Sequence, residues 1–185
     1  MTKFGIVFLF LSMAFTVPDN KAGGLFSLSR GNVTFHSNAP LELIRASSDK
    51  LKGLMDVDKK TFAFRIPVSS FQGFNSPLQQ VHFNENYMES DRYPDISFAG
   101  KIIEDYDLSQ AGTYDIRAKG IMSIHGVDQE RIIKAELVVR NGSIATQSKF
   151  TVLLADHNIK IPKVVEEKLA SEIMVEVKAE FIPKN

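Results

Sequence analysis

Alternation of apolar and polar residues is the feature that most constrains how this chain folds. Between residues 114 and 124, Ile116 and Met122 fall on one face, whereas Arg117 and Lys119 fall on the other. Successive side chains of a β-strand point to opposite faces of a sheet, so this period of two predicts a strand with one buried and one solvated face. The pattern recurs in these segments: 61–71, 95–103, 114–124, 133–140, 144–152 and 173–181. Consecutive strands of this kind are typical of an antiparallel sheet.

The number of strands favours a closed sheet. Val33 and Phe35 alternate with polar neighbours, and residues 51–57 suit a further short strand. The predicted total is therefore about eight, the number at which a barrel can enclose one small ligand. The apolar face must be covered, and too few residues suit helices for these to cover it. Either a barrel or two packed sheets would bury it, and the meander of consecutive strands from 113 to 156 favours the barrel.

Turns and short helices are predicted between the strands. Asn141-Gly142 is typical of a two-residue type I′ hairpin, in which both residues take a positive φ. Pro67 lies on the solvated face of its strand, which favours an edge position or a bulge. Helical structure is expected as a turn at 40–46, a helix at the start of 77–90 and a short helix at 161–170.

Small residues on the apolar face leave the state of the barrel interior open. They alternate with Phe, Ile and Met, and comprise Gly100, Ala118, Gly120, Ala135, Thr146, Ser148 and Ala179. In a filled interior, small side chains face large ones and complete the packing. In a hollow interior, they leave a channel for an elongated apolar molecule. The packing argument alone does not decide between these two interpretations.

Three short segments carry a resemblance to a known family. They are HFN at 82–84, YPDISF at 93–98 and GIMSIHGV at 120–127. In this order and spacing they are similar to the YceI-like family of bacterial exported lipid-binding proteins, and the resemblance extends over residues 31–182. It implies an all-β fold, a single antiparallel, roughly eight-stranded lipocalin-like barrel with one or two short helices. It also implies that the lumen takes a polyisoprenoid chain or an isoprenoid quinone.

The alternation and the resemblance together predict the binding residues. The expected lumen wall consists of Phe62, Phe64, Ile66, Phe98, Ile116, Met122, Ile124, Leu137, Phe150 and Val175. His82 and Tyr87 are expected at the barrel mouth, where they would contact a lipid head group. The expected function is non-enzymatic binding and carriage of an isoprenoid lipid, without catalytic residues, metal or cofactor. The alternatives are a fatty-acyl or other amphiphilic ligand, and a filled barrel with a structural or stress-related role.

The first residues have the order of a secretory signal peptide. Lys3 precedes an apolar run over residues 4–17, which is shorter than an ordinary membrane span. The small residues from Ala22 onward suit a cleavage site. We therefore expect a signal peptide at 1–22, a barrel domain at 23–185 and a periplasmic or secreted location. The chain contains no Cys, which excludes disulfides and cysteine chemistry.

Other classes of function have little support in the sequence. The 22 basic and 22 acidic residues balance, so no net positive charge would attract nucleic acid. The four His lie far apart without metal-site spacing, and His125 is interpreted as a strand-end residue that donates to a turn carbonyl. The GxSxG, GxGxxG and P-loop motifs are absent.

A membrane-spanning barrel is the remaining alternative, because alternation does not distinguish inside from outside. Such a barrel carries girdles of aromatic residues at the membrane interfaces, and this chain has no Trp. The expected partner is therefore an apolar lipid, bound by a barrel that does not span the membrane. The oligomeric state is left open, with a homodimer as one option.

Overall fold

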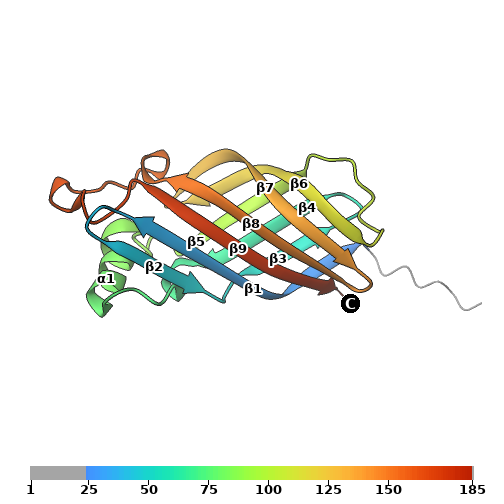
Figure 1. The fold of residues 1–185 in the computed structure, drawn as a ribbon, viewed down its shortest axis with the longest axis horizontal. Helices are drawn as coiled ribbons and strands as arrows, with labels where there is room; N and C mark the ends of the chain where they lie inside the picture. Colours follow the sequence, from blue (N-terminus) through green and yellow to red (C-terminus); the bar gives the residue numbers. More distant parts are fainter. Residues whose placement is uncertain (1–23, 185) are drawn as a thin grey trace, which may run out of the picture.

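Nine β-strands account for most of residues 24–184, which are the residues that the computed structural model describes. They are β1 (Leu25–Asn38), β2 (Leu43–Ser48), β3 (Lys52–Asp56), β4 (Thr61–Pro67), β5 (Asp95–Ile102), β6 (Gly112–Ile124), β7 (Val127–Arg140), β8 (Ser143–Leu153) and β9 (Glu172–Pro183). Eight of them close an antiparallel barrel, since the strands from β3 to β9 pair in sequence and both β3 and β9 pair with β1 (Figure 1). The predicted fold class is confirmed.

The side chains face as the alternation predicted. In β6, Ile116 and Met122 are buried, whereas Arg117 and Lys119 are exposed to solvent. The same alternation separates the two faces of β7, where Ile133 and Leu137 are buried. Apolar side chains therefore fill or line the interior, and charged side chains cover the outside. This is the reverse of the arrangement in a membrane-spanning barrel, whose apolar side chains point outward.

One wall of the barrel is made from an interrupted strand. β3 and β2 lie along the same edge of β1 and keep one register, because Leu25 pairs with Asp56 and Val33 pairs with Ser48. Residues 49–51 separate them. The prediction of a helical turn at 40–46 is wrong here: the free edge of β1 offers backbone hydrogen bonds along the full length of β2, which a helical turn would leave unmade.

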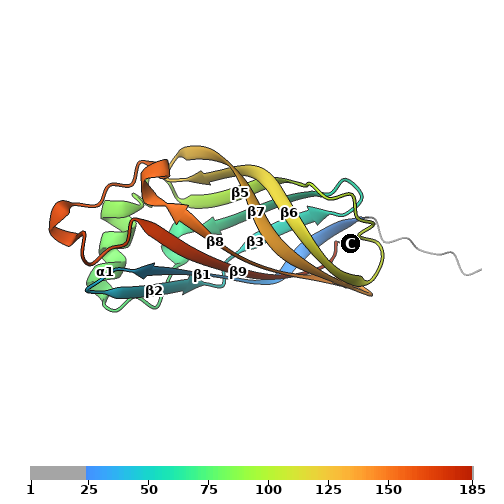
Figure 2. The same ribbon diagram turned by 45° about the horizontal axis from the view of Figure 1, so that its top comes forward.

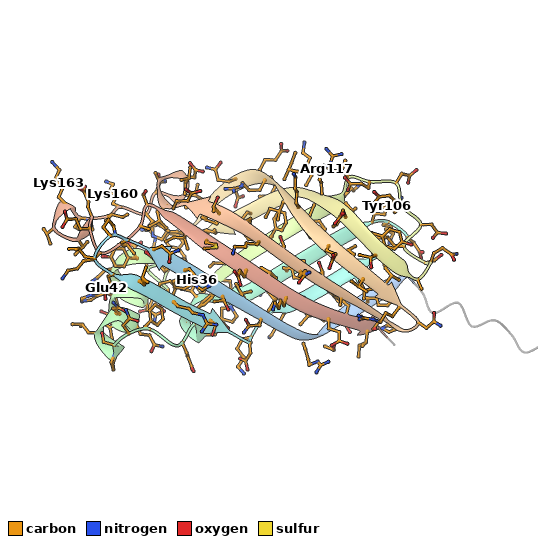
Figure 3. The ribbon with its side chains drawn as sticks, viewed as in Figure 1. His36, Glu42, Tyr106, Arg117, Lys160 and Lys163 are labelled. Atoms are coloured by element: carbon orange, nitrogen blue, oxygen red, sulfur yellow. The ribbon has the colours of Figure 1, made fainter. Side chains whose placement is uncertain are left out.

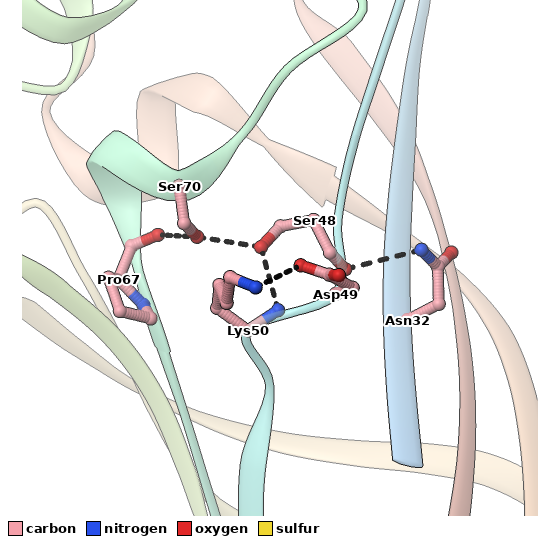
Figure 4. Close-up of polar contacts among 6 residues, drawn as sticks. All are labelled: Asn32, Ser48, Asp49, Lys50, Pro67 and Ser70. Carbon is pink, nitrogen blue, oxygen red and sulfur yellow. Dashed lines mark hydrogen bonds and ion pairs between the residues drawn. The ribbon is translucent and has the colours of Figure 1, made fainter.

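The interruption is fixed by a small polar network, shown in Figure 4. The hydroxyl groups of Ser48 and Ser70 are 2.6 Å apart, and Ser70 Oγ donates to the Pro67 carbonyl at 2.6 Å. Ser48 Oγ also accepts from the Lys50 backbone N–H at 3.1 Å. Asn32 Nδ2 donates to the Ser48 carbonyl at 3.3 Å. The network ties the break between β2 and β3 to the end of β4, where the barrel wall divides.

Residues 68–88, which we call the mouth insert, fill the gap where β2 separates from β4. The insert contains η1 (Val68–Ser70), α1 (Pro77–His82) and the π-helical turn η2 (Phe83–Tyr87). The α1 helix begins at Pro77 because the Ser76 hydroxyl caps it, accepting from Gln79 N at 3.2 Å. Ser47 and Gln72 exchange two backbone hydrogen bonds, which join the insert to β2. The helix predicted at the start of 77–90 is confirmed.

Two other local predictions require correction. The strand expected over 61–71 ends at Pro67, where Val68 begins a 3-10 turn, and β4 is paired on both sides instead of lying at an edge. The helix expected over 161–170 is only the 3-10 turn η4 (Lys163–Val165). The β-branched pair Val164-Val165 favours helix weakly, and so short a segment cannot stabilise one by itself.

The type I′ turn lies at a different hairpin from the one predicted. Gly142 has a φ of 81°, but Asn141 does not take a positive φ, so the β7–β8 turn is not of type I′. His125 (φ 51°) and Gly126 (φ 71°) instead form the two-residue turn between β6 and β7, with both φ values positive. A positive φ is uncommon for residues other than Gly, although His is among those enriched there, and contacts described below hold His125 in this conformation.

Candidate ligand-binding cavity

An apolar cavity of about 530 Å³ lies inside the barrel and reaches the end that carries α1. Figures 1 and 2 show α1 and the connection between β8 and β9 at this same end, opposite the C-terminus. We call it the mouth. Ligand pockets for small molecules usually measure about 300–1,000 Å³, so the space is large enough for one bound molecule.

The predicted lumen residues lie on the wall of this cavity. All ten line it: Phe62, Phe64, Ile66, Phe98, Ile116, Met122, Ile124, Leu137, Phe150 and Val175. They come from six consecutive strands, β4 to β9. Their inward direction follows from the alternation. That they contact a ligand remains a prediction.

The opposite end of the barrel is filled. Phe181 and Ile144 are fully buried, and Val139 and Leu108 pack with them in the same cluster, but none of these four side chains lines the cavity. The Phe181 ring packs edge-on against Phe64 with 5.7 Å between ring centres. The filled and hollow interpretations therefore each describe one part of the interior, and the cavity opens at one end only.

Small residues shape the cavity, but not all of those predicted. Ala118, Ala135 and Ser148 line it, as expected. Gly120 does not line it: a Cβ at this position would lie 2.8 Å from the Ala99 carbonyl carbon and closer still to its oxygen. Gly100, its partner in the β5–β6 ladder, is equally crowded by the backbone of β6. The two glycines allow the strands to approach, and they leave no room in the lumen.

Four phenylalanine rings surround the cavity near the mouth. Phe35 of β1 lies 5.4 Å from both Phe71 and Phe83 and 5.9 Å from Phe74, measured between ring centres. All four rings line the cavity. The α1 helix buries none of its own side chains, and the rings of Phe71, Phe74 and Phe83 pack the insert against Phe35 of β1. The sequence prediction missed the cluster, although Phe83 lies within the HFN segment.

Several polar residues of the wall lie at the mouth. His82 is exposed at the end of α1, and Tyr87 is half-buried in the π-helical turn. Both line the cavity, and their contact with a head group stays a prediction. Glu42, Gln79 and Lys168 also line it and were missed. Glu42 accepts a hydrogen bond from Gln79 Nε2, and so the polar groups available to a head group are concentrated at one end of an apolar cavity.

The three segments that resemble the YceI-like family meet near this end. The ring of Tyr93 packs edge-on against His125 at 4.6 Å, and Gly126 passes directly beneath Tyr93. His125 Nδ1 donates to the His157 carbonyl at 3.1 Å, and Glu89 Oε2 lies 3.4 Å from Nε2. The interpretation of His125 as a strand-end residue that donates to a turn carbonyl is confirmed, since His157 ends the 3-10 turn η3 (Leu154–His157). These contacts hold His125 in its left-handed conformation.

His157 itself is fully buried beside the β6–β7 turn. Its Nδ1 lies 3.3 Å from the Val127 carbonyl, and its Nε2 has no hydrogen-bond partner. Burial lowers the pKa of His157, because the charged imidazolium loses its hydration there. The neutral ring is thus part of the packing under the mouth, and it does not face the cavity.

Within residues 24–184, no group of three or more His, Asp or Glu side chains is arranged to hold a metal ion. No helix in the same part of the chain is both long and apolar enough to cross a membrane.

A closed antiparallel barrel with a one-ended apolar cavity defines a lipocalin-like architecture. The YceI-like domain model matches residues 12–181, and the chain belongs to the YceI-like family. No curated protein sequence matches it.

Solved structures share the fold at low sequence identity. A polyisoprenoid binding domain from Saccharophagus degradans, implicated in plant cell wall breakdown, has a TM-score of 0.73 at 13% identity, covering 86% of this chain and 98% of that one. Burkholderia cenocepacia BcnA has a TM-score of 0.66 at 13% identity, with 81% and 95% covered. The Campylobacter jejuni YCEI protein has a TM-score of 0.57 at 13% identity, with both chains covered in full. Identities this low show similarity of fold alone.

Proposed function

We propose that this protein binds an elongated isoprenoid lipid, a polyisoprenoid or an isoprenoid quinone, and carries it through an exported compartment without chemical change. The observation that carries the proposal is the one-ended cavity, whose wall is mainly apolar along its depth and whose mouth carries His82, Tyr87 and Lys168. The hydroxyl groups of Thr146 and Ser148 within the wall donate to backbone carbonyls of β7. Such a cavity suits a molecule with a long hydrocarbon chain and one polar end. The polyisoprenoid binding domain from Saccharophagus degradans, which shares the fold, supports the same class of ligand.

The energetics of burial favour a chain of several isoprene units. Each buried CH₂-sized group contributes about 0.8 kcal/mol, so a five-carbon unit contributes about 4 kcal/mol. Binding costs roughly 4–15 kcal/mol in lost translational and rotational freedom. A few units in the lumen therefore offset this cost without any strong polar contact. His82, Tyr87 and Lys168 lie where the polar end of the ligand would emerge.

The first experiment is mass spectrometry of an organic extract of the protein purified from its native host. We expect an isoprenoid chain in the extract. A fatty-acyl lipid would identify the alternative ligand of the same cavity, and an extract without lipid would contradict the carrier function.

A variant then tests whether the lumen is the binding site. Ala135 lines the cavity, and Ala135→Phe would fill part of it. We expect co-purified lipid to be lost while the thermal stability of the delipidated protein is maintained or rises, because the added ring buries apolar area in existing space. In a filled interior the same change would overpack the core and cost about 1–3 kcal/mol. Strong destabilisation with no lipid on the parent protein would refute the proposal.

Export is tested separately. The signal peptide predicted at 1–22 lies outside the described residues. N-terminal sequencing of exported protein should find a start near residue 23, and retention of Met1 on exported protein would contradict this part of the proposal.

A further inference from the structure

The mouth carries the most exposed large apolar side chains of the described chain. Within residues 24–184, the exposed fraction is highest for Val164 (88%), Leu43 (69%), Leu41 (65%) and Leu78 (61%). All four lie at the end of the barrel where the cavity opens. Solvent-exposed apolar residues are common singly, but a group of them on one surface marks a place of interaction.

Hydrogen bonds join the three segments that carry these residues. The backbone N–H of Leu41 donates to the Glu167 carbonyl at 2.8 Å, which joins the β1–β2 connection to the β8–β9 connection that carries Val164. Asn75 Nδ2 donates to the Leu43 carbonyl at 2.9 Å, which joins the insert before α1 to β2. We call Leu41, Leu43, Leu78 and Val164 the mouth rim.

The mouth rim is continuous with the cavity. Leu78 is exposed to solvent and is also part of the cavity wall. Val165, which follows Val164, lines the cavity as well. A lipid that enters or leaves the lumen therefore passes over the rim. If the rim faced water, the hydrocarbon chain would be exposed during transfer, at a cost that grows with every CH₂ group.

The connection that carries Val164 has three lysines and two glutamates over residues 160–168, with Lys160 and Lys163 before Val164 and the exposed Glu166 and Glu167 after it. Lys160 and Lys163 lie at the same end of the molecule as Val164, and Figure 3 shows both at the tip of the β8–β9 connection. Lysine side chains beside an apolar insertion reach the phosphate groups of a lipid surface while their methylene stems remain in the apolar boundary.

We propose that the mouth rim docks on the surface of a phospholipid membrane, with Val164 and Leu41 in the outer acyl region and Lys160 and Lys163 at the phosphates. The proposal rests on the proposed function, because it supplies the route by which a lipid would pass between bilayer and lumen. We favour a membrane over a second protein as the partner of the mouth rim, because the lysine side chains and the open cavity both suit lipid.

Vesicle flotation tests the proposal. The full protein is mixed with vesicles of phosphatidylcholine, with or without phosphatidylglycerol, and the bound fraction is measured. We expect the parent to bind both and to bind more tightly when phosphatidylglycerol is present. Val164→Asp should weaken binding to both vesicles about tenfold or more, the effect of removing one inserted valine side chain. Lys160→Glu with Lys163→Glu should abolish only the preference for phosphatidylglycerol.

A matched control separates the rim from apolar exposure in general. Ile132 on the wall of β7 is also exposed, at 55%, but lies away from the rim. Ile132→Asp should bind vesicles as the parent does. Because Val164 and Ile132 are both on the surface, neither variant should change thermal unfolding, which verifies that each is folded.

Several outcomes would overturn the proposal. These are a parent that binds neither vesicle, a Val164→Asp variant that binds as the parent does, and a parent dimer that this substitution dissociates. A second measurement, the binding of a short isoprenoid alcohol in detergent solution, distinguishes the two proposals. We expect Val164→Asp to bind this alcohol as the parent does. A parent that binds vesicles but no isoprenoid would refute the proposed function alone.

Discussion

A single methyl group at Gly120 should destabilise the protein more than a whole phenyl ring at Ala135. Gly120 and Gly100 face each other in the β5–β6 ladder, and neither backbone leaves room for a Cβ. In Gly120→Ala the new Cβ would lie 2.8 Å from the Ala99 carbonyl carbon, whereas real Cβ contacts are essentially never below 3.0 Å. The crowding atoms belong to the backbone of a paired strand, so β5 and β6 must separate or shift.

The expected cost follows from this geometry. Overpacking that forces backbone shifts costs about 1–3 kcal/mol, and in a chain of this length each kcal/mol lowers Tm by about 2–4 °C. Urea denaturation of delipidated protein measures the free energy of unfolding directly. We expect Gly120→Ala to lose at least about 1 kcal/mol and Ala135→Phe to lose nothing.

A control within the same strand keeps the comparison fair. Gly112 also lies in β6, but the three atoms nearest to a Cβ there all belong to the side chain of Tyr114, the nearest at 3.2 Å. That ring can move, so Gly112→Ala should change the stability by less than about 0.5 kcal/mol. If Gly120→Ala were as stable as Gly112→Ala, the close approach of β5 and β6 would be wrong, and with it the assignment of Gly120 outside the lumen.

Three further predictions concern the turn, the buried histidine and the two ends of the barrel. Gly142 has a φ of 81° with nothing within 4 Å of a built Cβ, so Gly142→Val should cost about 1–2 kcal/mol through backbone strain alone; an unchanged urea midpoint would contradict this. Burial holds the native pKa of His157 below its unfolded value. The unfolded state therefore binds the proton first, and stability should fall by up to about 1.4 kcal/mol per pH unit as the pH drops below about 6.5. The free energy of unfolding, measured by urea denaturation above and below that pH, should show this loss in the parent and in His82→Gln but not in His157→Gln. An equal loss in all three proteins would exclude His157 as its source. Finally, Phe181→Ala should cost about 3–5 kcal/mol at the filled end, and Phe150→Ala on the cavity wall should cost clearly less in the absence of lipid; equal losses in urea denaturation would mean that the cavity is not hollow.

The strands were predictable because alternation is a local property. The side of the sheet on which Ile116 or Leu137 lies depends only on its parity along the strand, and both lie inside as predicted. The residues of the cavity wall were predictable for the same reason, since inward residues of a barrel have nowhere else to point. Parity does not give the distance to the neighbouring strand, which is why Gly120 was wrongly assigned to the lumen.

Features that depend on contacts between distant segments were not predictable. The turn at His125 is stabilised by the carbonyl of His157 and the ring of Tyr93, both far away in the sequence. Local sequence instead favoured Asn141-Gly142. Likewise, β2 becomes a strand because the edge of β1 is free beside it, and residues 40–46 contain no alternation long enough to show this.

The position of the hollow, by contrast, follows from the sequence once one register is known. The two-residue turn pairs Arg140 with Ser143, and counting back along both strands pairs Ala135 with Ser148. Two small inward residues are therefore adjacent across β7 and β8, and their side chains leave a recess that neither would create alone. Near the closed end the same count pairs Val139 with Ile144, two large side chains that meet and fill the space. The register of this hairpin thus predicts where the small residues lie next to each other in the barrel. Ala135 is at the centre of the recess, so enlarging its side chain is the best test of whether the barrel is hollow or filled.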